Sequence, residues 1–84
     1  MILRVTKVEH LGPYRLRLEF TDGTVKDVDL AEELFGEVFE PLRDPQFFRR
    51  GVLNDETGTI EWPNGADFAP EFLSRIGSDV EQVV

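Results

Sequence analysis

The clearest hydrophobic pattern in the chain is the strict alternation of apolar and polar residues in YRLRLEF, residues 14–20. Its four apolar residues would share one face of a strand, and the charged residues between them would share the other. The dipeptide Asp22-Gly23 follows, and it is typical of tight hairpin turns because both residues tolerate positive φ. We therefore predict a hairpin between residues 14–20 and TVKDVDL, residues 24–30.

The register of this hairpin depends on how its apolar residues are paired. A two-residue loop places Phe20 opposite Val25, but it leaves Leu18 facing an aspartate. A shift by one residue places Leu18 opposite Val28 instead. We therefore predict a β-bulge at Lys26-Asp27, which would bring both apolar pairs onto one face. The opening segment, residues 2–10, is predicted as a further strand, and its poor alternation leaves its register open.

Short helices are predicted where capping residues meet apolar spacing. Aspartates at the N-terminal ends favour helices within residues 29–36 and 44–51, and glycines follow at their C-terminal ends. Pro45 suits the first position of the second helix, and Pro70 that of a third helix ending near Gly77. Residues 77–84 are expected to fray.

A second hairpin is predicted in VLNDETGTIEW, residues 52–62, where two apolar arms flank a polar tip. Pro63-Asn64-Gly65 then reverses the chain. The pattern shows no internal boundary, linker or helical repeat. We predict one α+β domain over residues 1–84, with a small, mostly antiparallel sheet of about five strands that includes two hairpins and is covered by short helices.

Four short motifs connect these elements to a known family. They are F-x-D-G at residues 20–23, V-D-L at 28–30, F-x-P-L-x-D at 39–44 and E-W-P-N-G-A-D at 61–67. Together they resemble the bacterial family catalogued as domain of unknown function 2442, over nearly the whole chain. The resemblance implies a common fold and no assigned activity.

Some members of that family carry an added helix-turn-helix of the lambda-repressor type, and others resemble members of two-gene operons of the toxin-antitoxin kind. The 84 residues contain no such helix-turn-helix. A regulatory role implied by the resemblance is therefore expected to act through a protein partner, such as the product of an adjacent gene.

The charge of the chain narrows the choice of partner. Seventeen acidic and nine basic residues give a net charge of −8, and residues 51–84 carry seven acidic residues against Arg75 alone. The negative electrostatic field of such a chain disfavours direct nucleic-acid binding and suits a basic protein partner. No apolar run approaches the length that spans a membrane, and the absence of cysteine fits a reducing compartment, so we expect a cytoplasmic protein. The sequence leaves open whether two copies pair as a homodimer.

Residue types suited to catalysis are sparse. His10 is the only histidine and cysteine is absent, so one protomer cannot supply the ligands of an ordinary zinc site. Neither Ser74 nor Ser78 lies in a nucleophile motif. We expect His10 to be a surface residue, and we assign no catalytic residue, metal or cofactor. The chain is predicted to be non-enzymatic.

The segment IEWPNGADF, residues 60–68, allows three interpretations. Glu61 and Asp67 could form an acid/base pair around a small ligand bound on Trp62, which is the hydrolytic alternative. An exposed Trp62 could instead anchor a contact surface together with Asn64 and Asp67. Arg49 and Arg50 are further contact candidates, although a solvated pair is the favoured interpretation of these two arginines.

The third interpretation, a structural corner, explains most of these residue types. The Pro-Asn-Gly turn would reverse the chain, and Asp67 would accept backbone N–H groups ahead of the last helix. Trp62 would pack against Phe68 and Phe72, with its indole N–H bound to a carbonyl or water. We favour this interpretation of the segment.

Overall fold

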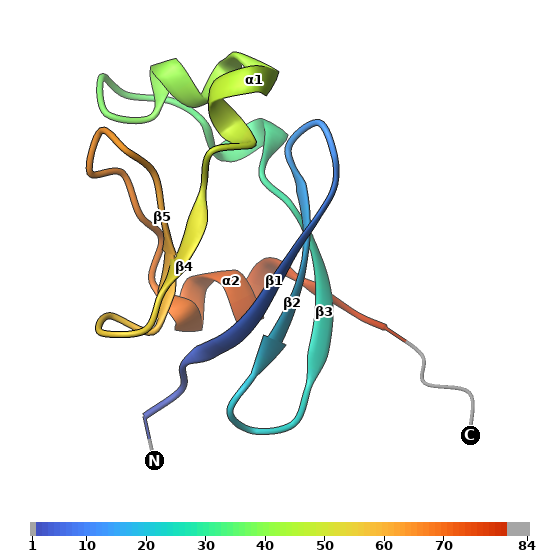
Figure 1. The fold of residues 1–84 in the computed structure, drawn as a ribbon. Helices are drawn as coiled ribbons and strands as arrows, with labels where there is room; N and C mark the ends of the chain where they lie inside the picture. The colour runs from blue at the N-terminus through green and yellow to red at the C-terminus, as the bar shows by residue number, and fades with distance from the viewer. Residues whose placement is uncertain (1, 81–84) are drawn as a thin grey trace.

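The computed structural model describes residues 2–80, which form two antiparallel sheets and short helices (Figure 1). The first sheet has the strand order β1-β2-β3-β6, and the second pairs β4 with β5. The predicted α+β class is confirmed, although the strands divide between two sheets. In chain order the elements are β1 (Val5–Gly12), β2 (Arg15–Phe20), β3 (Val25–Asp29), η1 (Ala31–Glu33), η2 (Glu40–Arg43), α1 (Pro45–Phe48), β4 (Val52–Asn54), β5 (Thr59–Glu61), α2 (Pro70–Ile76) and β6 (Ser78–Asp79).

The β2–β3 hairpin forms as predicted, but its turn is longer than a two-residue loop. The Phe20 amide donates to the Thr24 carbonyl at 2.9 Å and the Gly23 amide to the Phe20 carbonyl at 3.0 Å, which leaves three residues in the loop. Gly23 has the expected positive φ, 87°. Asp22 accepts from the Thr24 hydroxyl and amide, and these hydrogen bonds hold the pKa of Asp22 below its usual range.

The predicted bulge at Lys26-Asp27 is wrong, because β2 and β3 pair without interruption. The longer loop shifts the register so that Leu18 faces Lys26 and Leu16 faces Val28. Lys26 lies on the inner side of the sheet with only 18% of its side chain exposed, and its Nζ donates to the Ser74 carbonyl at 2.8 Å. The aliphatic stem covers the core while the ammonium reaches the end of α2, so an apolar partner for Leu18 is not required.

The irregularities of the sheet lie in β1, whose register the sequence left open. The register with β2 shifts between Val5 and Lys7 and again between His10 and Gly12. The first shift explains the poor alternation, since Val5 and Val8 are three residues apart yet lie opposite the inward-facing Phe20 and Leu18.

The turn between β1 and β2 removes Tyr14 from the strand in which its alternation placed it. Tyr14 adopts a left-handed conformation with φ 63°. Its ring contacts Phe48 of α1 edge to face at 5.5 Å, and its hydroxyl donates to the Arg43 carbonyl. These contacts hold α1 beside the β1–β2 turn, as Figure 1 shows.

Two of the three predicted helices are present in shortened form, and the third has the predicted bounds. Asp29 accepts from the Ala31 amide at 2.9 Å, but only the 3-10 helix η1 follows, and a second 3-10 helix, η2, precedes α1. Asp44 caps α1 through the Gln46 amide at 3.0 Å, and α2 spans Pro70 to Ile76. Asp44 and both prolines therefore act where they were predicted to act, whereas Asp29 lies one residue before the N-cap of η1, which is Leu30.

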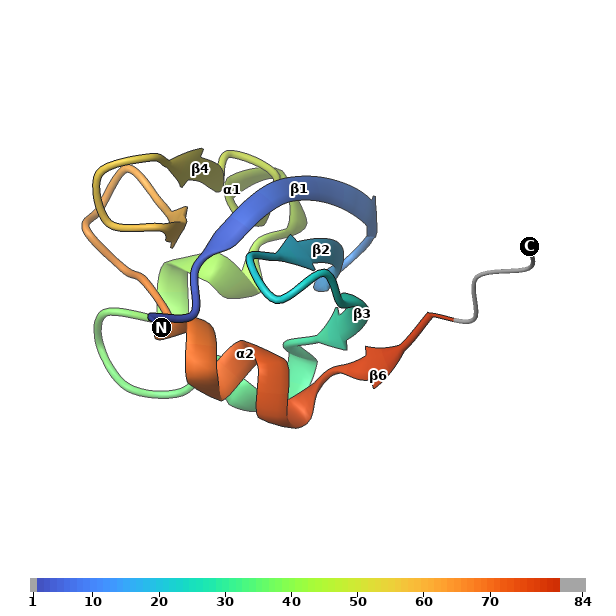
Figure 2. The same ribbon diagram turned by 90° about the horizontal axis from the view of Figure 1, so that it is seen from below.

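The prediction that residues 77–84 fray is wrong for residues 78–80. β6 pairs with β3, and the Val80 amide donates to the Val25 carbonyl at 2.9 Å. Figure 2 shows α2 leading directly into β6 beside β3. Residues 81–84 lie outside the described residues.

One buried cluster joins both sheets with η2, α1 and α2. Its fully buried side chains come from β2, β3, η2, α1, β5, α2 and the residue after β3: Leu16, Leu18, Val28, Leu30, Leu42, Phe48, Ile60 and Leu73. No helix in residues 2–80 is both long and apolar enough to cross a membrane.

Candidate functional site

Trp62 is a core residue at the corner that follows β5. Only 3% of it is exposed, and its indole Nε1–H donates to the Phe48 carbonyl at 2.7 Å. The ring packs at a centroid distance of 5.3 Å from Phe48 and 6.0 Å from Phe68, while Phe72 stacks on Phe68 instead. The interpretation of Trp62 as an exposed contact residue is thus corrected, because its ring faces the protein interior.

The corner repeats the turn of the β2–β3 hairpin. The Trp62 amide donates to the Ala66 carbonyl and the Gly65 amide to the Trp62 carbonyl, both at 2.9 Å, and Gly65 has φ 88°. Asn64 Oδ1 accepts from the Ala66 amide at 3.2 Å, as Asp22 does from Thr24. The structure does not show the Asx-type bond predicted from Asp67 to the backbone ahead of the last helix within residues 2–80, and Asn64 makes an Asx-type bond inside the corner turn instead.

Asn64 also attaches the corner to a distant loop. Its Nδ2 donates to the Val38 carbonyl at 2.8 Å, across 26 residues of sequence. Asp67 is exposed, and its side chain makes no hydrogen bond within residues 2–80. The candidate Asn64 thus holds the segment that carries Val38, whereas Asp67 is directed to solvent.

Substitution of these two residues should separate their roles. Asn64→Ala is expected to lower the free energy of unfolding by about 0.5 to 1.5 kcal/mol because two hydrogen bonds are lost. Asp67→Ala is expected to change it by less than about 0.5 kcal/mol, as is usual for an exposed residue. Urea unfolding of both variants measures the difference, and a larger loss at Asp67 would contradict the assignment of the turn to Asn64.

Glu61 and Asp67 form an isolated antiparallel bridge on the two arms of the corner. Glu61 is held by Asn54, whose Nδ2 donates to its carboxylate at 2.9 Å. The pocket that Asp67 and Glu33 line is otherwise apolar, and neither Glu61 nor the buried Trp62 belongs to its lining. The hydrolytic alternative requires all three residues around one ligand, and this arrangement does not bring them together there.

An apolar groove lies beside the corner. It has a volume of about 280 Å³, and we name it the corner groove after its lining: Glu33, Phe35, Phe39, Asp67, Phe68, Ala69 and Phe72. Phe35 is 70% exposed, and Val38, in the loop held by Asn64, is 51% exposed. This exposure departs from the usual pattern, because an apolar residue next to short helices normally faces a sheet.

Stacked aromatic rings form the floor of the corner groove. Phe39 stacks on Phe68 at a centroid distance of 4.7 Å, and Phe68 stacks on Phe72 at 5.7 Å. Phe68 is 8% exposed, and the two outer rings are half-buried. The Arg75 guanidinium lies over the Phe72 ring, 5.5 Å from its centroid. The floor is thus held by the core and already contacts one cation.

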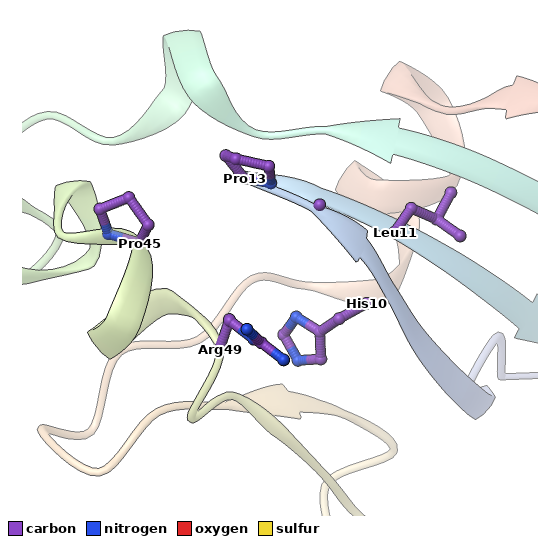
Figure 3. A pocket seen from close by; sticks show the side chains of 6 residues that line it. His10, Leu11, Pro13, Pro45 and Arg49 are labelled. Atoms are coloured by element: carbon purple, nitrogen blue, oxygen red, sulfur yellow. The ribbon is translucent and has the colours of Figure 1, made fainter.

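A second pocket, of about 340 Å³, lies between α1 and the β1–β2 turn, and Figure 3 shows the Arg49 side chain directed toward the His10 ring. Its lining also includes Leu11, Pro13 and Pro45. His10 is half-buried, which corrects its expected surface position. Its Nε2 lies 3.0 Å from the Gly51 carbonyl and therefore carries the proton, while Nδ1 is buried without a partner in the described chain.

The remaining basic residues are dispersed. Arg49 and Arg50 are both exposed, and the Arg50 guanidinium lies over the Phe47 ring at 5.7 Å from its centroid. Arg17 forms a bidentate pair with Asp27 at 2.8 and 3.1 Å, and this hydrogen bonding holds the pKa of Asp27 below its usual range and raises that of Arg17. Residues 2–80 bring no three potential metal-ligating side chains together.

Comparison with known proteins identifies the family of the chain. A family model described as protein of unknown function (DUF2442) matches residues 5–77. The chain belongs to this family. The matched range covers both sheets apart from β6 and includes the corner and its groove. No curated protein and no solved structure matches the chain.

Proposed function

We propose that this DUF2442 protein is a non-enzymatic, cytoplasmic protein-interaction module with an accessory regulatory role. Its partner is a protein, and the product of an adjacent gene is the first candidate, as in a two-gene operon of the toxin-antitoxin kind. The corner shapes the domain, and the surface beside it makes the contact.

The observation that carries this proposal is the exposure of Phe35, which lines the corner groove, and of Val38, which precedes the groove residue Phe39. A small domain that leaves a large aromatic side chain 70% exposed beside an apolar groove loses the stabilisation that burial would provide. The rings below it are fixed by stacking, so the groove exists before any partner arrives. Preformed apolar surfaces of this kind are typical of protein contacts.

Arg49 and Arg50 provide a separate test surface on the same protein. They lie at the end of α1, and neither belongs to the lining of the corner groove. A contact that uses them would depend on charge alone and would weaken with salt. The groove, by contrast, offers apolar area whose burial drives association.

Affinity capture from native lysate, beside the purified product of the adjacent gene, tests the proposed function. We expect the wild-type protein to retain a specific protein that Phe35→Ser/Val38→Ser releases, while Arg49→Gln/Arg50→Gln keeps it. Circular dichroism on each variant confirms that the fold is intact. Turnover of a small substrate by the purified chain, or absence of any retained protein under both conditions, would contradict the proposal.

A further inference from the structure

We infer that the corner groove binds a basic amphipathic segment of another protein, in which apolar side chains contact Phe35 and Val38 and lysine or arginine side chains face the surrounding carboxylates. This inference rests on the proposed function and specifies the chemistry of the partner. The proposed function used the exposure of apolar side chains, and the present inference adds the charge of the residues around the groove.

The charged side chains that line the corner groove are both acidic. Glu33 and Asp67 line it directly, and within residues 2–80 its lining includes no lysine or arginine. Three further exposed acids adjoin the apolar residues in sequence: Glu37 precedes Val38, Glu40 follows Phe39, and Glu71 precedes Phe72. An apolar groove lined by two carboxylates complements a ligand with an apolar stripe and the opposite charge.

Cations also suit the floor of this groove. Arg75 lies over the Phe72 ring at 5.5 Å from its centroid, so the chain itself already places a guanidinium on these aromatic rings. An incoming lysine or arginine would find ring faces and carboxylates of the same kind. The partner is therefore a basic segment rather than a neutral apolar one.

A second copy of this chain fits the groove poorly. A two-fold contact brings the same patch of both copies together. Glu33 and Asp67 of one copy would then lie opposite the same residues of the other, and like charges at an interface cost binding energy. The net charge of −8 per chain adds to this repulsion. A basic partner removes both costs.

A defined peptide tests this chemistry without any assumption about the native partner. The probe is a fluorescent helical peptide of about 15 residues with leucines on one face and lysines elsewhere, a length that presents about four helical turns. One control peptide has glutamate in place of lysine. The other keeps the composition but scrambles the leucines, so that net charge is preserved and the apolar face is lost. Fluorescence anisotropy measures each dissociation constant.

Matched variants locate the binding site. Phe35→Ser/Val38→Ser removes the exposed apolar side chains, and Val52→Ser removes another that is 63% exposed on β4. Glu33→Gln/Asp67→Asn removes the two carboxylates of the groove. Asp55→Asn/Glu56→Gln removes two exposed carboxylates at the tip of the β4–β5 hairpin. This control variant therefore has the same net charge as Glu33→Gln/Asp67→Asn.

We expect the lysine peptide to bind, and both groove variants to weaken binding by at least about tenfold while both control variants change it less than about twofold. Equal binding of the glutamate or scrambled peptide would overturn the inference, as would equal losses in the groove and control variants. A dimer in sedimentation that Phe35→Ser/Val38→Ser dissociates would identify a second copy as the occupant and also overturn it.

The lysate and peptide experiments fail independently. A protein retained from lysate whose capture is unchanged in the groove variants supports a protein-interaction role, but it places the contact outside the corner groove and overturns the basic segment. A lysine peptide held specifically in the groove, with no protein retained from lysate, supports the chemistry of the groove and overturns the proposed function.

Discussion

Trp62→Ala is expected to lower the free energy of unfolding by about 3 to 5 kcal/mol, as is typical when a large buried aromatic side chain is removed. The ring is 3% exposed, contacts Phe48 and Phe68, and donates to the Phe48 carbonyl, which also accepts from the Gly51 amide at 3.1 Å. Trp62 is also the only tryptophan, so its fluorescence disappears with the substitution. Far-ultraviolet circular dichroism in a urea titration is therefore the appropriate measurement.

Phe35→Ala is the matched control for Trp62→Ala, since it also removes an aromatic ring. Phe35 is 70% exposed, so its loss is expected to change the free energy of unfolding by less than about 0.5 kcal/mol. Similar losses of unfolding free energy in the two variants would show that Trp62 at the corner contributes no more to stability than the exposed Phe35 in the groove. A Trp62→Ala protein as stable as wild type would place that ring outside the core.

Gly51→Ala is expected to destabilise the fold by about 1 to 3 kcal/mol, the usual effect of overpacking a core. A Cβ atom at Gly51 would lie 2.6 Å from Trp62 Cε2 and 2.7 Å from its Nε1. The glycine carbonyl also lies 3.0 Å from His10 Nε2, so displacement of this residue affects two neighbours. Urea unfolding of Gly51→Ala measures the loss.

A double-mutant cycle connects this loss to the tryptophan ring. Leucine at position 62 has no atoms in place of Nε1, Cε2 and Cζ2, the three atoms that the new Cβ would approach. Gly51→Ala is therefore expected to cost less in a Trp62→Leu background, with a coupling energy of about 1 kcal/mol or more. Additive losses would contradict a direct contact and indicate that Gly51 is required for the backbone alone.

Local turn and cap chemistry is the part of the fold that the sequence predicted best. Asp44 and Pro45 begin α1 as expected, and Gly23 adopts the positive φ that its hairpin requires. The pairing of the strands was harder to predict, because an inward-facing lysine resembles a surface residue in sequence. Lys26 satisfies its ammonium at the Ser74 carbonyl, a contact across 48 residues that no local pattern reveals.

The candidate site was predicted in part. The corner interpretation of residues 60–68 identified a turn, a buried Trp62 and an indole hydrogen bond to a carbonyl, and all three are confirmed. It expected Asp67 to accept backbone N–H groups ahead of the last helix, whereas the Asx-type bond of this segment is made by Asn64 inside the turn. The repeated spacing of Asp22-Gly23 and Asn64-Gly65 carried that signal, since both turns place an Asx residue before a glycine of positive φ.

The corner groove was not predicted. Phe35 and Val38 flank the turn glycine Gly36, which has φ 92°. The chain direction changes there, so their helical spacing does not continue into a shared inward face. Asn64 then holds the resulting loop at the Val38 carbonyl. The family motif at residues 61–67 thus supports the surface beside it, and apart from Asp67 the lining of that surface comes from residues outside the motif.

Nuclear magnetic resonance of the isotope-labelled protein, titrated with the lysine peptide, tests most directly the claim that the corner is structural and the groove makes the contact. We expect saturable shifts of the Phe35, Val38, Phe39 and Phe72 side-chain resonances. The Trp62 indole N–H, held at the Phe48 carbonyl, should change little and exchange slowly with solvent. Saturable shifts confined to the His10 and Arg49 pocket, or a Trp62 indole N–H that exchanges rapidly with solvent, would contradict this assignment.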